Sequence, residues 1–380
     1  MIKLIFQKFL KDTLIFFIIM CFSLGMIVWV IQAVNFLDFV SEDGHSLYVY
    51  FKYTMLNFPK IVHRILPFIF FVSMFLQLSK YESKNQLIIF WSIGITKIQF
   101  INIIVLYSII FSIFQIFLGS YLSPTLQNEA RSYIRSSNVD FFPSLIKEGK
   151  FIDTVSDLTI FIASKNKDDF YQNIFINDSS NKKDKNISQI IYAKKGVLIN
   201  EDKEKYFKLY NGKIINKEKN KVIDFSFEEI DFSLTKFNSK TTTHPKLQET
   251  SSLDLLKCNY YRYMNKISEF KANFFRCDQG KIDEIKQETL KRFYKPIYIP
   301  LIGLICCLLL TFSKENKYYN RFKFSLFLFG FFIVVISEIS LRFSTYNIFG
   351  FLFFTLFPIL TFLSIYTFFL FSKYNYRFKS

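Results

Sequence analysis

Features of metal sites and of nucleotide hydrolysis are missing from this 380-residue sequence. Only three histidines occur, and none belongs to an H-E-x-x-H pair or to another spacing that suits metal ligands. No G-x-x-x-x-G-K-S/T loop occurs, which excludes ATP hydrolysis by the P-loop route. The five cysteines form no C-x-x-C pair. We therefore expect no catalytic residue, no cofactor and no metal ion in this chain.

Long apolar segments are what the sequence has instead. Six of them have the length of about 17 to 25 residues that crosses the hydrocarbon core of a bilayer. Three precede residue 123 and three follow residue 295, which predicts a polytopic membrane protein with a 3+3 arrangement of spans. No small-residue cleavage site follows the first segment, which indicates a retained span rather than a signal peptide. The expected spans are about 13–34, 61–78, 98–122, 296–312, 324–341 and 348–371.

Basic residues predict the orientation of these spans. The net charge is +17, and the excess lies mainly in the N-terminal segment, the connections 79–97 and 313–323, and the C-terminal tail. Short loops rich in Lys and Arg face the cytoplasm. Both termini are therefore expected in the cytoplasm, and the polar block 123–290 is expected outside. A nucleic-acid partner is not expected, because the basic excess follows the membrane segments rather than a folded face.

The polar block alternates apolar and polar residues, with turn residues between the segments. This pattern is typical of antiparallel strands and predicts a β-sandwich or jelly roll at 123–252. The pair Asn211-Gly212 indicates a tight turn between two strands. A polar helical connector is expected at 253–295.

The cysteines divide into two groups. Cys21, Cys306 and Cys307 lie in apolar spans, where cysteine behaves as a small hydrophobic residue. Cys258 and Cys277 flank a helical stretch of the connector. A disulfide between them requires an oxidising compartment, and we favour free thiols.

Several segments share features that occur together, and in the same order, in one protein family. The segment LPFIFFVSMFLQLSKYESKNQLIIFWSIGIT (66–96) has a proline in the second span, a coupling-helix stretch and a Gly-Ile-Thr sequence. YAKKGVLINEDKEKYFKLYNGKI (192–214) has an Ala-x-x-Gly and Asn-Gly pattern, LKRFYKPIYIPLIGL (290–304) leads into the fourth span, and Pro358 lies in the sixth. These segments resemble the lipopolysaccharide-export permeases LptF and LptG. VWVIQAVNFLDFVSEDG (28–44) looks more like LptF.

The resemblance implies a membrane α-helical fold with six transmembrane helices and an inserted periplasmic all-β jelly-roll-like domain. Helices 1–3 would occupy 1–122 and helices 4–6 would occupy 296–380. The implied function is that of a transmembrane permease subunit of an ABC transporter in the bacterial inner membrane, which extracts lipopolysaccharide and passes it to a periplasmic bridge. ATP hydrolysis is expected on a separate subunit. The implied partners are a cytoplasmic ABC ATPase dimer, a second six-span permease of the same family, periplasmic jelly-roll bridge proteins, lipopolysaccharide and membrane lipids.

The connection at 80–97 is the main candidate for coupling to an ATPase. A short amphipathic helix with aromatic residues can fill a groove on a soluble partner, or it can lie at the bilayer interface. The resemblance favours the partner. The family usually has a glutamate where this chain has Gln86, so either Glu82 substitutes for it or the contact is a neutral hydrogen bond. The expected coupling residues are Glu82, Asn85, Gln86, Leu87, Phe90, Trp91 and Gly94.

Cations near the outer ends of the spans are candidates for binding the substrate, because Arg and Lys bind the phosphates of lipopolysaccharide. The alternative for each is ordinary snorkelling of a span-end cation. Glu338, the one acid well inside a span, is expected to pair locally with Arg342 (i, i+4). The candidate substrate-binding residues are Lys52, Lys60, Arg64 and Arg342.

Two other classes of function remain open from the residues alone. One is a different ABC-type permease or mechanotransmitter with an outer domain. The other is a non-transport membrane scaffold or sensor, whose 80–97 segment would bind lipid and which would need no ATPase.

Overall fold

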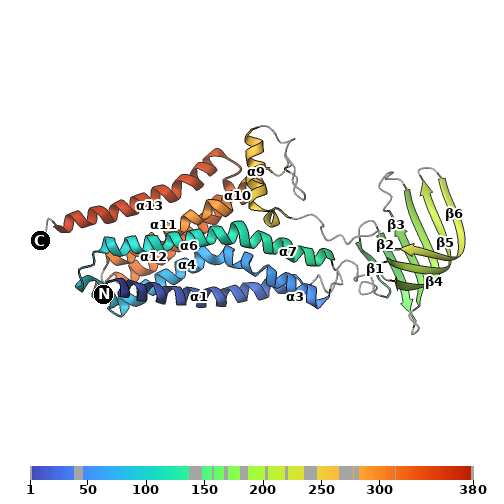
Figure 1. The fold of residues 1–380 in the computed structure, drawn as a ribbon, viewed down its shortest axis with the longest axis horizontal. Helices are drawn as coiled ribbons and strands as arrows, with labels where there is room; N and C mark the ends of the chain where they lie inside the picture. The colour runs from blue at the N-terminus through green and yellow to red at the C-terminus, as the bar shows by residue number, and fades with distance from the viewer. Residues whose placement is uncertain are drawn as a thin grey trace. The chain divides into compact units, whose positions relative to one another are not determined.

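The computed structural model describes residues 2–37, 46–136, 148–155, 158–166, 170–179, 187–201, 204–218, 221–234, 246–264, 277, 282–312 and 314–377. These residues belong to two compact units (Figure 1). The helical unit comprises Met1–Ile31, Leu56–Glu129 and Pro245–Ser380, and the second unit comprises Gln32–Met55 and Ala130–His244.

The helices follow the predicted spans. Six helical segments of the described chain are long and apolar enough to cross a membrane, and they begin and end at Lys3–Asn35, Leu47–Ser83, Lys97–Ile134, Ile282–Thr311, Tyr319–Phe343 and Ile348–Phe371. The six predicted spans are thereby confirmed. The helices are α1 (Ile2–Asn35), α3 (Leu47–Leu56), α4 (Phe58–Ser83), α5 (Gln86–Ser92), α6 (Lys97–Phe117), the π-helix η1 (Leu118–Leu122), α7 (Ser123–Ser136), the 3-10 helix η3 (Leu247–Glu249), α9 (Ser252–Tyr263), α10 (Ile282–Phe293), the 3-10 helix η6 (Lys295–Ile297), α11 (Tyr298–Cys307), the 3-10 helix η7 (Leu308–Thr311), α12 (Tyr319–Phe343) and α13 (Ile348–Arg377).

Helix α11 lies at the centre of the helical unit, where it contacts α4, α6, α12 and α13 (Figure 1). Its apolar residues are buried along nearly the whole helix. Two glycines permit close helix packing: a Cβ on Gly303 would lie 2.1 Å from Ser108 Oγ, and one on Gly330 would lie 2.2 Å from Phe71 Cε2. Small residues at helix crossings are typical of membrane bundles, because they let neighbouring helices approach closely.

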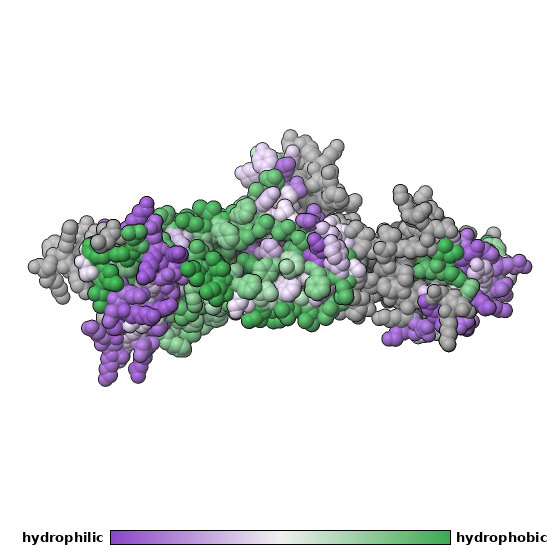
Figure 2. Space-filling model, turned by 60° about the horizontal axis from the view of Figure 1, so that its bottom comes forward, coloured by the Kyte–Doolittle hydropathy of each residue, from purple (hydrophilic) through white to green (hydrophobic). Residues whose placement is uncertain are grey.

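The outer helices have the opposite character. Only 11% of the most apolar 18-residue stretch of α1 is buried within the structure, and the fraction is the same for α13. Figure 2 shows a broad apolar surface over the helical unit, with hydrophilic residues gathered at the end near the N-terminus. Such a belt is expected where lipid or another apolar chain covers the helices.

The second unit contains an antiparallel sheet. Its described strands are β1 (Phe151–Val155), β2 (Leu158–Lys165), β3 (Tyr171–Asp178), β4 (Ile187–Glu201), β5 (Glu204–Glu218) and β6 (Lys221–Ser233), and they pair in chain order. The predicted membrane α-helical fold with an inserted β-domain is thus confirmed. The described strands form a meander, without the pairs between distant strands that Greek-key connections of a jelly roll produce.

One face of the sheet carries the core of the β-domain. Ile160, Ile176, Ile191 and Phe207 are almost fully buried, and each comes from a different strand. Alternate residues point to opposite faces of a strand, so the neighbours of these residues face outward.

The predicted turn at Asn211-Gly212 is wrong. Both residues lie inside the continuous strand β5, where Asn211 has a φ of 52°. A Cβ on Gly212 would lie 2.1 Å from the backbone oxygen of Tyr192 on β4. This point of β5 therefore requires one residue that tolerates a positive φ, which is Asn211, and one residue without a side chain beside the backbone of β4, which is Gly212.

Candidate functional site

The short helix α5 has one face built into the core of the helical unit. Leu87 and Phe90 are 2% and 1% exposed. The ring of Phe90 lies 5.2 Å from that of Phe6 and 5.1 Å from that of Phe100, both in edge-on geometry. These aromatic contacts attach α5 to α1 and α6, because edge-to-face pairs are favourable beyond the area they bury.

The two ends of α5 are fixed by residues with special backbone conformations. Asn85 precedes the helix with a φ of 59°, and Gly94 follows it with a φ of 84°. The Ile95 N–H donates to Phe90 O and the Gly94 N–H donates to Trp91 O, which is a Schellman motif with buried Ile95 as its apolar contact. The sequence Gly-Ile-Thr thus ends one helix and starts the next.

Helix α6 begins directly after this motif. The Thr96 hydroxyl accepts a hydrogen bond from the Gln99 N–H, and the Gln99 side chain accepts one from the Thr96 N–H, forming a capping box. Lys97 Nζ donates to Leu310 O at 2.9 Å, which joins this start to η7. The orientation of α5 relative to α6 is therefore set by hydrogen bonds on both sides of one turn.

The exposed face of α5 is apolar. Ile88 is 57% exposed and Ile89 is 50% exposed. The predicted coupling residues are thus divided between two environments: Leu87 and Phe90 are buried, Gln86 and Trp91 are half-buried, and Asn85 and Gly94 are exposed. The helical period places positions 87 and 90 on the face opposite to 88 and 89. This period is the sequence signal from which Ile88 and Ile89 can be recognised as the exposed face of α5.

Glu82 interacts within its own chain. Its carboxylate accepts a hydrogen bond from the backbone of Lys314, and the positive charges of Lys97 and Lys314 act on it favourably. The side chain is half-buried. It joins the end of α4 to the connection between η7 and α12.

Two of the predicted substrate-binding cations meet in one place. Arg64 of α4 and Arg342 of α12 are both exposed, and both line an open pocket of about 760 Å³. The other lining residues are Glu338, Ile339, Phe343 and Tyr346. Two guanidinium groups in one pocket can hold a phosphate through paired N–H donors.

The expected pair of Glu338 with Arg342 is replaced by a different one. The Glu338 carboxylate accepts a hydrogen bond from Lys295 Nζ of η6. Among the described residues, Lys295 is the ion-pair partner of Glu338. Lys295 is buried, so pairing lowers the cost of burying its charge. Arg342 is thereby left available to the pocket.

The other two predicted cations lie elsewhere. Lys60 is half-buried on α4, one turn before Arg64, where the charges of Lys246 and Lys291 also act on it. Lys52 belongs to the second unit, and its ammonium group lies 5.8 Å and 5.9 Å from the ring centres of Tyr48 and Tyr133. Such cation–π contacts account for the position of Lys52.

Arg292 organises the connector. It is 1% exposed and donates to the Thr250 carbonyl at 2.9 Å, to Ser252 Oγ at 2.8 Å and to Glu288 Oε1 at 3.1 Å. Its second terminal nitrogen donates to the carbonyls of Leu247 and Gln248. The planar guanidinium group suits such a network, because it presents several donors in fixed directions. Arg292 is therefore a structural residue of the fold.

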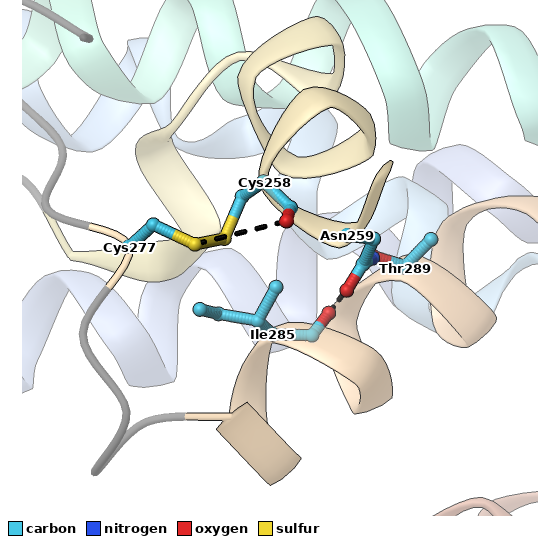
Figure 3. Close-up of a disulfide and its surroundings, with 5 residues drawn as sticks. All are labelled: Cys258, Asn259, Cys277, Ile285 and Thr289. Carbon is cyan, nitrogen blue, oxygen red and sulfur yellow. Dashed lines mark hydrogen bonds between the residues drawn. A yellow bond between two sulfur atoms is a disulfide. The ribbon is translucent and has the colours of Figure 1, made fainter. Parts of the chain in front are cut away.

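Cys258 and Cys277 form a disulfide, so the prediction of free thiols is wrong (Figure 3). Cys258 lies on α9, and Cys277 precedes α10. Nearby, Asn259 Nδ2 donates to Thr289 Oγ1 at 3.0 Å, and Leu255 packs with Ile285. The disulfide and these contacts hold α9 against α10.

Comparison with known proteins identifies the family. A family model described as "Lipopolysaccharide export system permease LptF/LptG" matches residues 8–373. The chain belongs to the LptF/LptG family. It is also 22% identical over 320 residues to the uncharacterized protein RP871 of Rickettsia prowazekii (strain Madrid E), a match that covers 83% of this chain and 85% of that protein.

Membership in the LptF/LptG family confirms the resemblance that the sequence motifs carry. The chain is a lipopolysaccharide export permease of this type and is not itself an enzyme. This function accords with the six membrane-spanning segments and the inserted sheet. It also favours the permease over the mechanotransmitter and the scaffold.

Proposed function

We propose that this LptF/LptG-type chain is one transmembrane subunit of an ATP-driven transporter that extracts lipopolysaccharide from the bacterial inner membrane and passes it to a periplasmic bridge. A second six-span permease of the same family would complete the transport cavity. A cytoplasmic ABC ATPase dimer would supply the work. LptF is the favoured subunit type, because of the segment 28–44.

The observation that carries this proposal is the two-sided structure of α5. Leu87 and Phe90 attach the helix to its own unit, while Ile88 and Ile89 are exposed at 57% and 50%. An exposed apolar pair on a fixed helix suits a groove on a soluble partner. We assign Ile88 and Ile89 to the contact with the ATPase, with Gln86 as a neutral hydrogen-bonding neighbour.

The pocket with Arg64 and Arg342 suits the phosphates of the lipid A head group. Both guanidinium groups are exposed, and the ion pair with Lys295 neutralises the negative charge of Glu338. Lys60 would add positive charge one turn away on α4. Lys52 remains a candidate of the second unit for a later contact with the same anionic head group.

The acyl chains would lie against exposed apolar residues of α1 and α12. Ile18, Phe22 and Val30 of α1 are more than half exposed, and so are Phe324 and Phe332 of α12. Lipid tails and a partner permease both suit such surfaces, since each covers apolar side chains without polar contacts.

The β-domain would pass the substrate onward. Strand β6 pairs with β5 on one side within the described sheet, and it exposes Val222, Ile223 and Phe225. A free strand edge can add a strand from a further β-protein. Periplasmic jelly-roll bridge proteins are the partners that fit this edge.

The disulfide supports the orientation that the basic loops predict. Disulfides persist in the periplasm and are rare in the cytosol. The Cys258–Cys277 bridge therefore supports a periplasmic position for α9 and α10, on the same side of the membrane as we propose for the β-domain. Both termini and α5 would then be cytoplasmic.

Mild affinity purification from native membranes, followed by mass spectrometry, tests the proposed assembly. We expect a soluble ABC ATPase, a second six-span protein and bound lipopolysaccharide. In a parallel sample, Arg64→Glu combined with Arg342→Glu should reduce cross-linking to lipopolysaccharide, while the surface variant Lys257→Glu should not. Recovery of the chain alone, with neither ATPase nor lipopolysaccharide, would contradict the proposal.

A further inference from the structure

The connector helix α9 has an exposed apolar face. Leu253, Leu256, Tyr260, Tyr263 and Met264 are between 42% and 85% exposed. Because an α-helix turns once every 3.6 residues, side chains at these positions lie on one side of α9. Soluble proteins rarely leave a contiguous apolar patch of this kind uncovered unless it meets a partner or a membrane.

The opposite side of α9 is fixed to α10. Leu255 and Cys258 are buried and pack with Ile285 of α10. The disulfide between Cys258 and Cys277 reinforces this contact (Figure 3). The helix therefore cannot turn its apolar face inward unless these contacts are broken.

The two ends of α9 lie level with the outer ends of two membrane spans. At its start, the Ser252 hydroxyl donates a hydrogen bond to the carbonyl of Ser120 in η1. The π-helix η1 is the last apolar turn of the third span, because α7 after it is rich in polar residues. At the other end of α9, Tyr263 lines one pocket together with Ile348, the first residue of the sixth span.

This placement makes α9 run along the surface of the membrane rather than through it. A helix whose two ends both lie at the outer ends of spans must be roughly parallel to the plane of the bilayer. Figure 1 agrees, since α9 lies across the direction of α11 and α13. The apolar face of α9 is therefore close to the boundary between the hydrocarbon core and the head groups.

The apolar face of α9 also continues the apolar surface of the spans. Ile348 and Phe349 at the start of α13 are 78% and 85% exposed. Exposed apolar residues at the start of a membrane span are suited to contact with lipid. Because Tyr263 is a neighbour of Ile348, lipid that covers the start of α13 would reach α9 next.

The residue types of this face suit the head-group region. Tyrosine is enriched at the membrane–water interface, because its ring is apolar and its hydroxyl group can reach the head groups. Tyr260 and Tyr263 supply two such rings, and Leu253 and Leu256 supply aliphatic side chains. This combination is typical of amphipathic helices that lie in the plane of the interface.

We propose that α9 is an interfacial membrane helix, and that phospholipid of the leaflet at the outer ends of the spans covers its apolar face. The disulfide would connect this anchor to α10, which continues into the fourth span. The anchor would thereby fix the height of the connector relative to the bilayer. It goes beyond the proposed function, because it depends neither on the exported substrate nor on an ATPase.

Tryptophan fluorescence in lipid nanodiscs tests the position of α9. The full-length Tyr260→Trp protein is reconstituted with phosphatidylethanolamine and phosphatidylglycerol, and the emission of the wild type, from Trp29 and Trp91, is subtracted. Phospholipid brominated near its carbonyl groups should quench about half of the added emission, because interfacial helices lie about 5–10 Å deep. Acrylamide, a quencher dissolved in the water, should have little effect.

Tyr261→Trp is the matched control. Tyr261 is the next residue along α9, and it is half-buried on a different side of the helix. Its added emission should be quenched less by the brominated lipid than that of Tyr260→Trp. Leu256→Trp is a second probe of the apolar face, to be used if Tyr260→Trp does not yield folded protein.

Three outcomes would overturn the inference. Quenching of the tryptophan at position 260 by acrylamide, and not by the brominated lipid, would place the face in water. Protection from both quenchers would assign the face to a protein contact, with the β-domain or with a partner chain. Equal quenching by lipid at positions 260 and 261 would remove the assignment of one lipid-facing side. Each of these results would leave the proposed export function standing, since co-purification tests it separately.

Discussion

Substitutions on the two faces of α5 should separate stability from coupling. Phe90→Ala removes a ring that is 1% exposed and lies 5.1 to 5.2 Å from the rings of Phe6 and Phe100. A buried aromatic residue cut to alanine costs about 3–5 kcal/mol, because the lost contacts leave a cavity. Ile88→Ala and Ile89→Ala change side chains that are half or more exposed, and each should cost below about 1 kcal/mol.

Two measurements on the same preparations test this difference. Thermal denaturation followed by intrinsic fluorescence should show a lower midpoint for Phe90→Ala and an almost unchanged midpoint for the double variant Ile88→Ala/Ile89→Ala. Co-purification of the ATPase, normalised to folded permease, should fall strongly for the isoleucine variant. A Phe90→Ala protein of normal stability would refute the assignment of this ring to the core. Normal ATPase recovery with the isoleucine variant would refute the docking face.

Three further substitutions test the packing of the helical unit and its connector. Cys258→Ser should expose α9 and α10 to protease, because opening a loop closed by Cys277 at a separation of 19 residues removes about 3 kcal/mol of stabilisation; equal cleavage with and without the disulfide would contradict this. Gly330→Val should lower the free energy of unfolding by about 1–3 kcal/mol, and with it the denaturation midpoint, since a Cβ at this position would lie 2.2 Å from Phe71 Cε2; an unchanged midpoint would contradict the close packing of α12 against Phe71. Arg292→Ala should lower the free energy of unfolding by about 3–5 kcal/mol and reduce the yield of folded protein. Arg292→Lys should retain only part of this stability, because lysine lacks the planar donors; full stability of the lysine variant would show that the charge alone is needed.

The spans and the β-domain could be predicted because their signals are local. Apolar length identifies a membrane helix, and alternation identifies a strand, without knowledge of what packs against either. The Asn211-Gly212 pair misled for the same reason. The sequence shows a residue that tolerates positive φ, but the length of β5 depends on pairing with β4 and β6 on both sides.

The site could be predicted only in part, because it depends on contacts between distant segments. The resemblance to LptF and LptG assigns Leu87 and Phe90 to a coupling helix, but burial by α1 and α6 decides which residues of this helix remain exposed. The sequence predicts that Glu338 pairs with Arg342, the cation nearest to it along the chain, whereas Lys295 reaches it from another helix. The thiols of Cys258 and Cys277 were separated in the sequence and brought together by the pairing of α9 with α10.

The turn at Gly94–Thr96 has a mechanical consequence. The Schellman motif that ends α5 includes Ile95, and Thr96 is the N-cap of α6, so no residue without a role in a cap separates the two helices. A partner that displaces Ile88 and Ile89 would therefore rotate α5 and α6 together, because this turn transmits the displacement of α5 to α6. An insertion of one or two glycines after Ile95 would leave both helices folded and the displacement without effect.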